Sequence, residues 1–144
     1  VEFNVRFGDP ECQVMMRRLE SDLLPVLYAA ATSGLENQIM SWTDEAAALV
    51  VLAADGYPGK YEKGSVIKGV SDANALPGVV VFHAGTKSGN GDLIANGGRV
   101  LNVTATGPTI KEAVRRAYAG VDAIDWPHGF CRRDIGWRAL AGAS

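Results

Sequence analysis

The sequence predicts an α+β fold, on three observations. Short apolar or alternating runs between residues 46 and 105 are typical of β-strands, and glycine-rich turns separate these runs. Strands joined by such short turns pair in antiparallel order. A strongly amphipathic helix is predicted over residues 110–124. We therefore expect a lead-in of one strand and helices, followed by a small antiparallel, barrel-like sheet that a helix covers.

The lead-in begins with a strand pattern over residues 1–6, in which apolar and polar side chains alternate. Natural domains seldom start inside such a pattern, so we expect the chain to be a piece of a longer one. A helix is predicted next, with Asp9 as its N-cap and Pro10 as its first residue. An apolar stripe then runs at four-residue spacing through Met15, Leu19 and Leu23.

A second helical segment is predicted to follow, with Ser21 as its cap. Pro25 falls in the first turn of this segment, where proline does least harm. Gly34 is a plausible end of the helix, because glycine readily takes the left-handed conformation that terminates helices.

Strands are predicted in the middle of the chain at residues 46–54, 65–70, 79–84 and 99–105. Residues 56–59, 88–91 and 96–98 are predicted turns. The Asn96-Gly97-Gly98 sequence favours a type I′ hairpin, which requires positive φ at its centre. The two later turns are rich in glycine, but neither leads from a strand into a helix, so they do not have the form of phosphate-binding loops.

The helix over 110–124 is the clearest element in the sequence. Thr109 and Glu112 have capping-box spacing, in which each side chain satisfies a backbone donor of the other. Arg115 and Arg116 are expected on the outer, solvated face of this helix. The face at helical period is apolar and consists of Ile110, Ala113, Val114, Ala117, Tyr118, Val121 and Ile124.

Composition excludes several classes of protein. The 144 residues are 47% apolar, and 14 Lys and Arg stand against 16 Asp and Glu for a net charge of −2. Nucleic-acid binding needs a surplus of cations, and this chain has none. No apolar run approaches the roughly 20 residues of a membrane span. We expect neither a nucleic-acid nor a membrane partner. Cys12 and Cys131 are expected to be two free thiols in a reducing cytoplasm, which predicts cytoplasmic localisation.

The sharpest candidate site is the polar face of the opening strand. Glu2, Asn4 and Arg6 occupy alternate positions and so point to one side. Carboxylate and amide oxygens suit a hard divalent cation, and a neighbouring guanidinium can grip a phosphoryl or carboxylate oxygen. An exposed polar strand face would have the same pattern, so the residues alone leave both interpretations open.

Other polar residues also have two interpretations. Asp9 and Glu11 are either a carboxylate pair for acid–base chemistry or the start of a helix. His83 lies in an apolar strand, where a lone histidine is more often a satisfied core or rim residue than a functional one. His128 has no partner that the sequence identifies.

Together, these segments resemble the C-terminal part of the phosphoribosylamine-glycine ligase family, also called glycinamide ribonucleotide synthetases. Residues 2–11, Glu-Phe-Asn-Val-Arg-Phe-Gly-Asp-Pro-Glu, resemble the end of that family's ATP-grasp domain. Further motifs follow in the family's order and spacing over nearly the whole chain. They are Gly56-Tyr57-Pro58-Gly59, Val81-Phe82-His83-Ala84-Gly85-Thr86, Asn96-Gly97-Gly98-Arg99-Val100-Leu101 and Arg133-Asp134-Ile135-Gly136-Trp137-Arg138-Ala139.

The resemblance implies an ATP-dependent carbon-nitrogen ligase of purine biosynthesis. Its substrates would be ATP, glycine and 5-phosphoribosylamine, and its products glycinamide ribonucleotide, ADP and phosphate, by way of glycyl phosphate. The resemblance implies that Glu2 and Asn4 bind Mg²⁺ or Mn²⁺ and that Arg6 orients phosphate or acyl-phosphate oxygens. It makes Asp9 a candidate substrate contact.

The resemblance also implies a division of the chain. Residues 1–35 would be the C-terminal end of the ATP-grasp domain, and residues 36–144 the ligase's C-terminal domain. The family's substrate domain, glycine-rich lid and adenine contacts all precede Glu2, so the partner of this chain would be the N-terminal part of the same enzyme. We expect the 144 residues alone to be inactive. Two alternatives are another ATP-grasp carboxylate-amine ligase and a free-standing, non-catalytic binding or regulatory module derived from the C-terminal domain.

Overall fold

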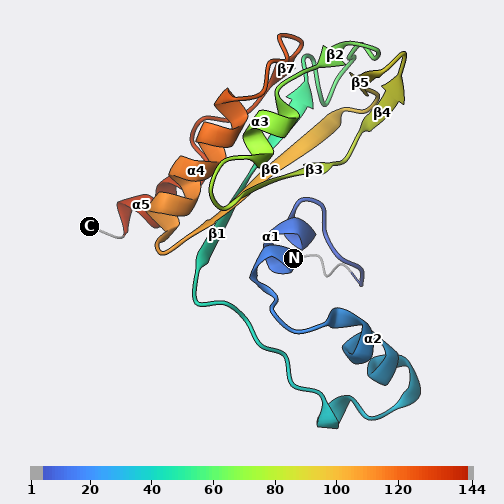
Figure 1. Cartoon of the computed structure of the whole chain (residues 1–144), viewed down its shortest axis with the longest axis vertical. Helices are drawn as coiled ribbons and strands as arrows, with labels where there is room; N and C mark the ends of the chain where they lie inside the picture. The colour runs from blue at the N-terminus through green and yellow to red at the C-terminus, as the bar shows by residue number, and fades with distance from the viewer. Residues whose placement is uncertain (1–4, 143–144) are drawn as a thin grey trace.

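The fold is a sheet core with a long N-terminal excursion (Figure 1). The computed structural model describes residues 5–142. Within that range the helices are α1 (Glu11–Arg18), α2 (Leu23–Thr32), the short 3-10 helix η1 (Leu35–Asn37), α3 (Val70–Asn74), α4 (Ile110–Asp122) and α5 (Trp137–Ala141). The strands are β1 (Ala46–Ala54), β2 (Val66–Ile67), β3 (Val79–His83), β4 (Thr86–Gly89), β5 (Asp92–Ala95), β6 (Arg99–Gly107) and β7 (Gly129–Phe130).

The strands form two antiparallel sheets, so the predicted α+β class is confirmed. One sheet has the order β3-β6-β1-β7, and the other has the order β2-β5-β4. The two long strands β1 and β6 lie side by side at the centre of the larger sheet, with Val50 opposite Val103. Strands therefore flank β6 on both sides along its whole inner part, which makes it the best-supported strand of the molecule.

The main core lies between the larger sheet and α4. Alternate residues of β1 and β6 face this helix, among them Val50 and Val103, which are 1% and 0% exposed. The predicted apolar face of α4 meets them through Ala117 and Val121. The periodicity of this helix was therefore predicted correctly, because burial against the sheet and helical period coincide.

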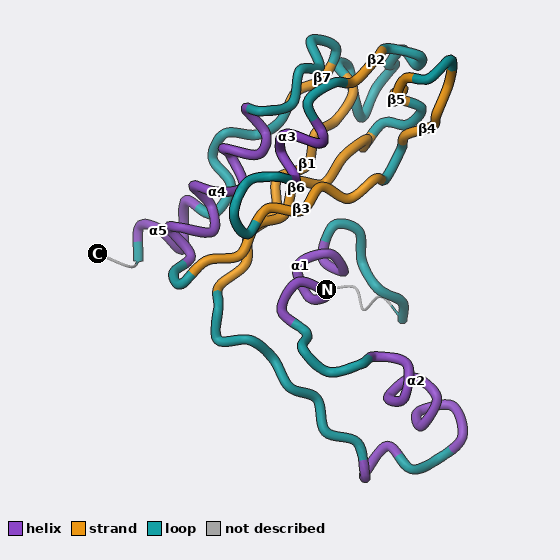
Figure 2. Tube along the Cα trace, viewed as in Figure 1, coloured by secondary structure: helices purple, strands orange, loops and turns teal. Residues whose placement is uncertain are grey.

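The opposite face of the larger sheet receives α1. Figures 1 and 2 show α1 across the sheet from α4, with α2 farther out and away from both sheets. None of the residues of α1 is buried. On this side β6 contributes the completely buried polar residues Asn102 and Thr104, whereas β1 contributes Leu49 and Val51, which line an apolar pocket with Pro10. The α1 interface thus contains both polar and apolar residues.

Residues 20–42 form an excursion that we call the apolar arm. Its base is closed by antiparallel pairing, with a Glu20 N–H to Ser41 O bond of 3.0 Å and a Thr43 N–H to Arg18 O bond of 2.9 Å. Within α2, Ala29 is the buried residue. The large apolar side chains of the arm, in α2 and after it, are exposed, namely Leu24, Leu27, Tyr28, Leu35, Ile39, Met40 and Trp42.

Several boundaries in the N-terminal region were predicted wrongly. Pro10, not Asp9, is the N-cap of α1, and no side chain caps it. The stripe through Leu19 and Leu23 is interrupted, because α1 ends at Arg18 and Leu19 pairs with Trp42 instead. The predicted strand over residues 1–6 lies mostly outside the described residues. Turn and bend, not strand, follow at Val5 and beyond.

The second helix also begins one residue late. Asp22 caps α2 by accepting the Leu24 N–H at 2.9 Å, whereas the Ser21 hydroxyl accepts from Ser41 N–H and holds the base of the arm. Pro25 does lie in the first turn of α2, and left-handed backbone at Ser33 and Gly34 ends the helix as predicted.

Two predictions in the middle of the chain were wrong. The strand predicted at 65–70 is only Val66–Ile67, and Val70 already begins α3. The turn at 96–98 is not a type I′ hairpin, because it joins β5 of one sheet to β6 of the other and neither glycine has positive φ. Its glycines permit close packing instead: a Cβ on Gly97 would lie 3.0 Å from the Cα of Gly85. The turn at 88–91 is the hairpin predicted, with positive φ at Asn90 and Gly91.

At the start of α4, one of the two hydrogen bonds of the predicted capping box forms and the other does not. The Thr109 hydroxyl accepts the Glu112 N–H at 3.2 Å, as expected. The Glu112 carboxylate binds Arg115 and Arg116 rather than returning to the cap. Arg115 is exposed as predicted, but Arg116 is three-quarters buried and also donates to the Thr106 carbonyl. Among residues 5–142, no helix is both long and apolar enough to span a membrane.

Candidate functional site

The candidate site is built where the segment before α1 meets the start of β6. Asp9 precedes α1, and its carboxylate points toward β6 rather than along its own helix. Its Oδ2 lies 3.1 Å from Nη2 of Arg99, and its Oδ1 accepts from Nδ2 of Asn102, also at 3.1 Å. Arg99 additionally donates to the Asp9 carbonyl at 3.1 Å, and Gln13 donates to Oδ1 at 2.9 Å. The carboxylate therefore has three protein partners, two on β6 and one on α1.

The remaining predicted site residues lie just before Asp9. Arg6 is exposed, and its guanidinium donates to the neighbouring Phe7 carbonyl at 3.2 Å. Glu2 and Asn4 lie outside the described residues. Their proposed metal site and the role of Arg6 stay predictions, as does a substrate contact by Asp9. Glu11 takes no part in a carboxylate pair with Asp9, since its side chain folds back against Gly8.

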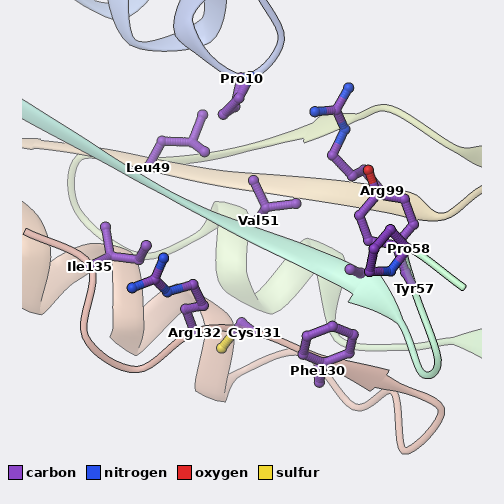
Figure 3. Close-up of a pocket in the computed structure, with 11 residues that line it drawn as sticks. Pro10, Leu49, Val51, Tyr57, Pro58, Arg99, Phe130, Cys131, Arg132 and Ile135 are labelled. Atoms are coloured by element: carbon purple, nitrogen blue, oxygen red, sulfur yellow. The ribbon is translucent and has the colours of Figure 1, made fainter.

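An apolar pocket of about 400 Å³ adjoins the Asp9–Arg99 pair (Figure 3). Leu49 and Val51 of β1 rise from its floor, Pro10 closes it from the α1 side, and Arg99 stands at one end beside the turn after β1. The full lining is Pro10, Leu49, Val51, Ala53, Tyr57, Pro58, Arg99, Phe130, Cys131, Arg132 and Ile135. The pocket can accept an apolar group, and the Arg99 guanidinium at its end is already paired with Asp9.

The Cys131 thiol in this pocket is not activated. Partial burial raises the pKa of Cys131, because removal from water disfavours the thiolate. Neither cysteine forms a disulfide, as predicted. The pocket is consequently suited to binding and does not contain an activated thiol nucleophile.

The strongest pKa shift belongs to a structural group away from this site. Arg115 and Arg116 on α4 hold the pKa of Glu112 at about 2, by hydrogen bonds and by charge. Similarly, the Arg132 guanidinium lowers the pKa of Asp134. The Arg115 and Arg132 guanidiniums are exposed, whereas Glu112 and Arg116 are about a quarter exposed, and all of these contacts join charged groups of the protein, which is typical of structural ion pairs.

The histidines do not form a metal site with other ligands in the described part of the chain. His83 Nδ1 lies 2.9 Å from the Thr86 hydroxyl, which is the satisfied rim position expected for it. His128 borders a separate polar pocket with Asp55, Glu62, Lys63 and Ser65. Over residues 5–142, no cluster of three or more His, Cys, Asp or Glu side chains is arranged to hold a metal ion.

Sequence reasoning missed the two residues that hold Asp9. Arg99 entered the sequence analysis only as part of a family motif, and Asn102 only as a residue within the strand predicted at 99–105. An asparagine in the centre of a strand is unusual, because asparagine is depleted in sheets. That local signal marks a buried polar contact but does not identify its partner, which lies 93 residues away in sequence.

The chain is similar to known proteins over almost its whole length. Residues 47–138 match the family "Phosphoribosylglycinamide synthetase, C domain". The chain is 62% identical to phosphoribosylamine–glycine ligase of Mesorhizobium japonicum over 98% of its own length and 33% of the relative's. It is 57% identical to the chloroplastic enzyme of that name from Arabidopsis thaliana, over 97% of this chain and 27% of the relative.

A solved structure agrees with these similarities. The crystal structure of phosphoribosylamine–glycine ligase from Thermotoga maritima superposes with a TM-score of 0.67 and 36% identity, over 93% of this chain and 32% of that one. The chain thus spans about a third of the length of the relatives that it matches. It belongs to the family of phosphoribosylglycinamide synthetase C domains.

Proposed function

We propose that this chain is the C-terminal portion of an ATP-dependent ligase that joins glycine to 5-phosphoribosylamine. The observation that carries the proposal is the match of 98% of the chain, at 62% identity, to a relative named phosphoribosylamine–glycine ligase. The products are glycinamide ribonucleotide, ADP and phosphate. ATP is a co-substrate that phosphorylates the glycine carboxylate, after which the amine attacks the acyl phosphate.

The residues just before α1 supply the proposed chemistry of this portion. Glu2 and Asn4 offer carboxylate and amide oxygens, a donor set that fits Mg²⁺ or Mn²⁺. When bound, such a cation offsets charge that develops on the phosphates during transfer. Arg6 would bind phosphate or acyl-phosphate oxygens, and its exposed guanidinium has donors available for a ligand. Asp9 is proposed as a second contact near the substrates.

The division into two parts is likewise proposed, with residues 1–35 belonging to the ATP-grasp domain and 36–144 to the C-terminal domain. The family match begins only at residue 47, after the apolar arm. At the contact between the two parts, buried polar residues of β6 lie beside apolar residues of β1, and no residue of α1 is buried. Such an interface is what two neighbouring domains of one chain would have.

The apolar arm supplies the proposed partner contact. Ile39 is 88% exposed, Leu24 71% and Tyr28 69%, although residues of these types are usually buried. Large exposed apolar side chains gathered in one short segment are typical of an interaction site. Because the relatives are about three times as long as this chain, we propose that the arm packs against the N-terminal part of the same ligase.

Hydrogen exchange tests the arm. In the complete ligase we expect amides of residues 23–42 to exchange at least about tenfold more slowly than in the 144-residue chain, because burial suppresses local opening. Helix α4 serves as the internal control, since its burial against β1 and β6 is complete within this chain. Equal exchange of the arm in both proteins would contradict the proposed contact.

Glycine-dependent release of ADP tests the proposed activity. We expect turnover from the complete ligase and none from the 144-residue chain. In the complete ligase, Glu2→Ala should raise the metal concentration for half-maximal activity far more than Arg115→Ala does. Arg115 is a suitable control, because it is 66% exposed on α4 and pairs with Glu112. Equal effects of the two substitutions would remove the metal assignment.

A further inference from the structure

The segment before α1 makes few contacts with the rest of the protein; the Gly8 carbonyl accepts the Cys12 N–H at 2.9 Å, and Asp9 makes the remaining polar contacts beyond the segment. Val5 is fully exposed and Phe7 is half-exposed. The Arg6 guanidinium bonds only to the neighbouring Phe7 carbonyl among the described residues. Along the described chain, Asp9 is the first residue whose side chain reaches another element. The position of residues 5–8 therefore depends on how Asp9 is held.

Residues of β6 bind both the side-chain carboxylate and the backbone carbonyl of Asp9. One Arg99 nitrogen binds the carboxylate and another binds the backbone carbonyl, each at 3.1 Å. Asn102 donates to the second carboxylate oxygen at 3.1 Å. Because the two arginine contacts reach two different acceptors, they fix the orientation of the peptide as well as its position. We call Asp9, Arg99 and Asn102 the β6 clamp.

The strand β6, which carries Arg99 and Asn102, is rigid. Asn102 is completely buried, as are its neighbours Leu101 and Val103, and β6 is paired with β1 and β3 on its two sides. A buried, doubly paired strand opens rarely, so its side chains keep their positions. Two residues, Phe7 and Gly8, separate Arg6 from Asp9, so the two Cα atoms are at most about 11 Å apart in extended chain.

We infer that Arg99 and Asn102 are positioning residues of the proposed ligase site. They act through Asp9, and they hold the segment before α1, which carries Arg6. The C-terminal domain thereby contributes to the geometry of a site whose reactive residues belong to the segment before α1. This inference rests on the proposed function for its catalytic meaning, but the clamp itself is testable without turnover.

Hydrogen exchange of the 144-residue chain tests the clamp directly. Arg99→Ala should speed exchange of the amides between residues 8 and 18 about fivefold, since it removes an exposed ion pair together with a charged hydrogen bond. Arg133→Ala is the matched control, because Arg133 forms a similar exposed pair with Asp122 at 2.7 Å. Unchanged exchange at 8–18 in Arg99→Ala, or an equal change in the control, overturns the inference.

Steady-state kinetics of the complete ligase tests the positioning role. Arg99→Ala should raise the metal concentration for half-maximal activity about fivefold, by loss of the same contacts, with a smaller change in kcat at saturating metal. Arg99→Lys should recover part of the effect, because lysine keeps the charge but lacks the fork that reaches both acceptors. A fall in kcat alone, with metal dependence unchanged, would indicate a merely structural role and overturn the inference.

The two experiments separate the clamp from the proposed function. Absence of glycine-dependent ADP release from the wild-type complete chain would overturn the proposed function and with it the ligase role of Arg99. The exchange result on the 144-residue chain does not depend on that activity. It decides by itself whether Arg99 holds the segment before α1.

Discussion

Replacement of Gly120 by alanine should destabilise the protein, although alanine is the better helix former. Gly120 lies on the buried face of α4, near its C-terminal end. A Cβ at this position would lie 2.8 Å from a methyl group of Val103 and 2.8 Å from one of Val79. Both valines are core residues of the sheet, 0% and 4% exposed. The glycine lets the helix approach the sheet at this point.

The two opposing effects can be compared in magnitude. Alanine gains up to about 1 kcal/mol over glycine inside a helix. Overpacking of a closed core costs about 1–3 kcal/mol, and here one methyl group strikes two β-branched side chains that have little rotamer freedom. We expect the steric cost to prevail by about 1–2 kcal/mol. For a chain of this size the loss corresponds to a fall in Tm of roughly 5 °C.

A double-mutant cycle identifies the cause. Urea denaturation, followed by circular dichroism, should give free energies of unfolding for Gly120→Ala, Val79→Ala and the double variant. Because Val79→Ala removes one of the two clashing methyl groups, the double variant should lose about 1 kcal/mol less than the sum of the single losses. A Tm of Gly120→Ala at or above the wild-type value would refute the reasoning, as would strict additivity.

Two further predictions concern the start of α4. Thr109→Ala should lower the free energy of unfolding by about 1 kcal/mol, because it removes the acceptor for the Glu112 N–H, whereas Thr109→Ser should retain most of the stability. Equal losses in a urea titration would contradict the cap. Arginine contacts depress the pKa of Glu112 from 4.5 to about 2 in the folded state. Its contribution to stability is therefore present above pH 4.5 and is lost as the pH falls toward 2. Glu112→Gln should flatten the fall in Tm over that range, and an unchanged profile in thermal scans would exclude this contribution.

Local pattern predicted the elements whose burial and periodicity agree. The strand over residues 46–54 has the predicted bounds, and the apolar face of α4 packs on it as expected. In both cases a continuous or periodic apolar sequence meets a single partner surface. One sequence feature therefore specifies both the element and the side that it buries.

Elements whose form depends on distant contacts were predicted less well. The 96–98 turn has hairpin composition, but its glycines serve a close approach to Gly85 and join two different sheets. Asp9 has the type and position of a helix cap, yet Arg99 and Asn102 take its carboxylate. Local propensity indicates which structures a residue favours in its own segment. It contains no information on a competing partner such as Arg99, which lies 90 residues after Asp9 in the sequence.

Prediction of the site depends both on local sequence pattern and on contacts between distant residues. The residue types at Glu2, Asn4 and Arg6 are compatible with cation and phosphate chemistry, which the family resemblance implies, and spacing two apart places residues of a strand on one side. Catalytic positioning demands more, because displacement by about 1 Å can cost a factor of 10² in rate. That precision has to come from a rigid support, and the segment before α1 has little burial of its own. The best-buried strand of the chain is β6, and it grips this segment at Asp9. The clamp therefore gives a physical reason why β6 would matter to the proposed site, whose residues lie before α1.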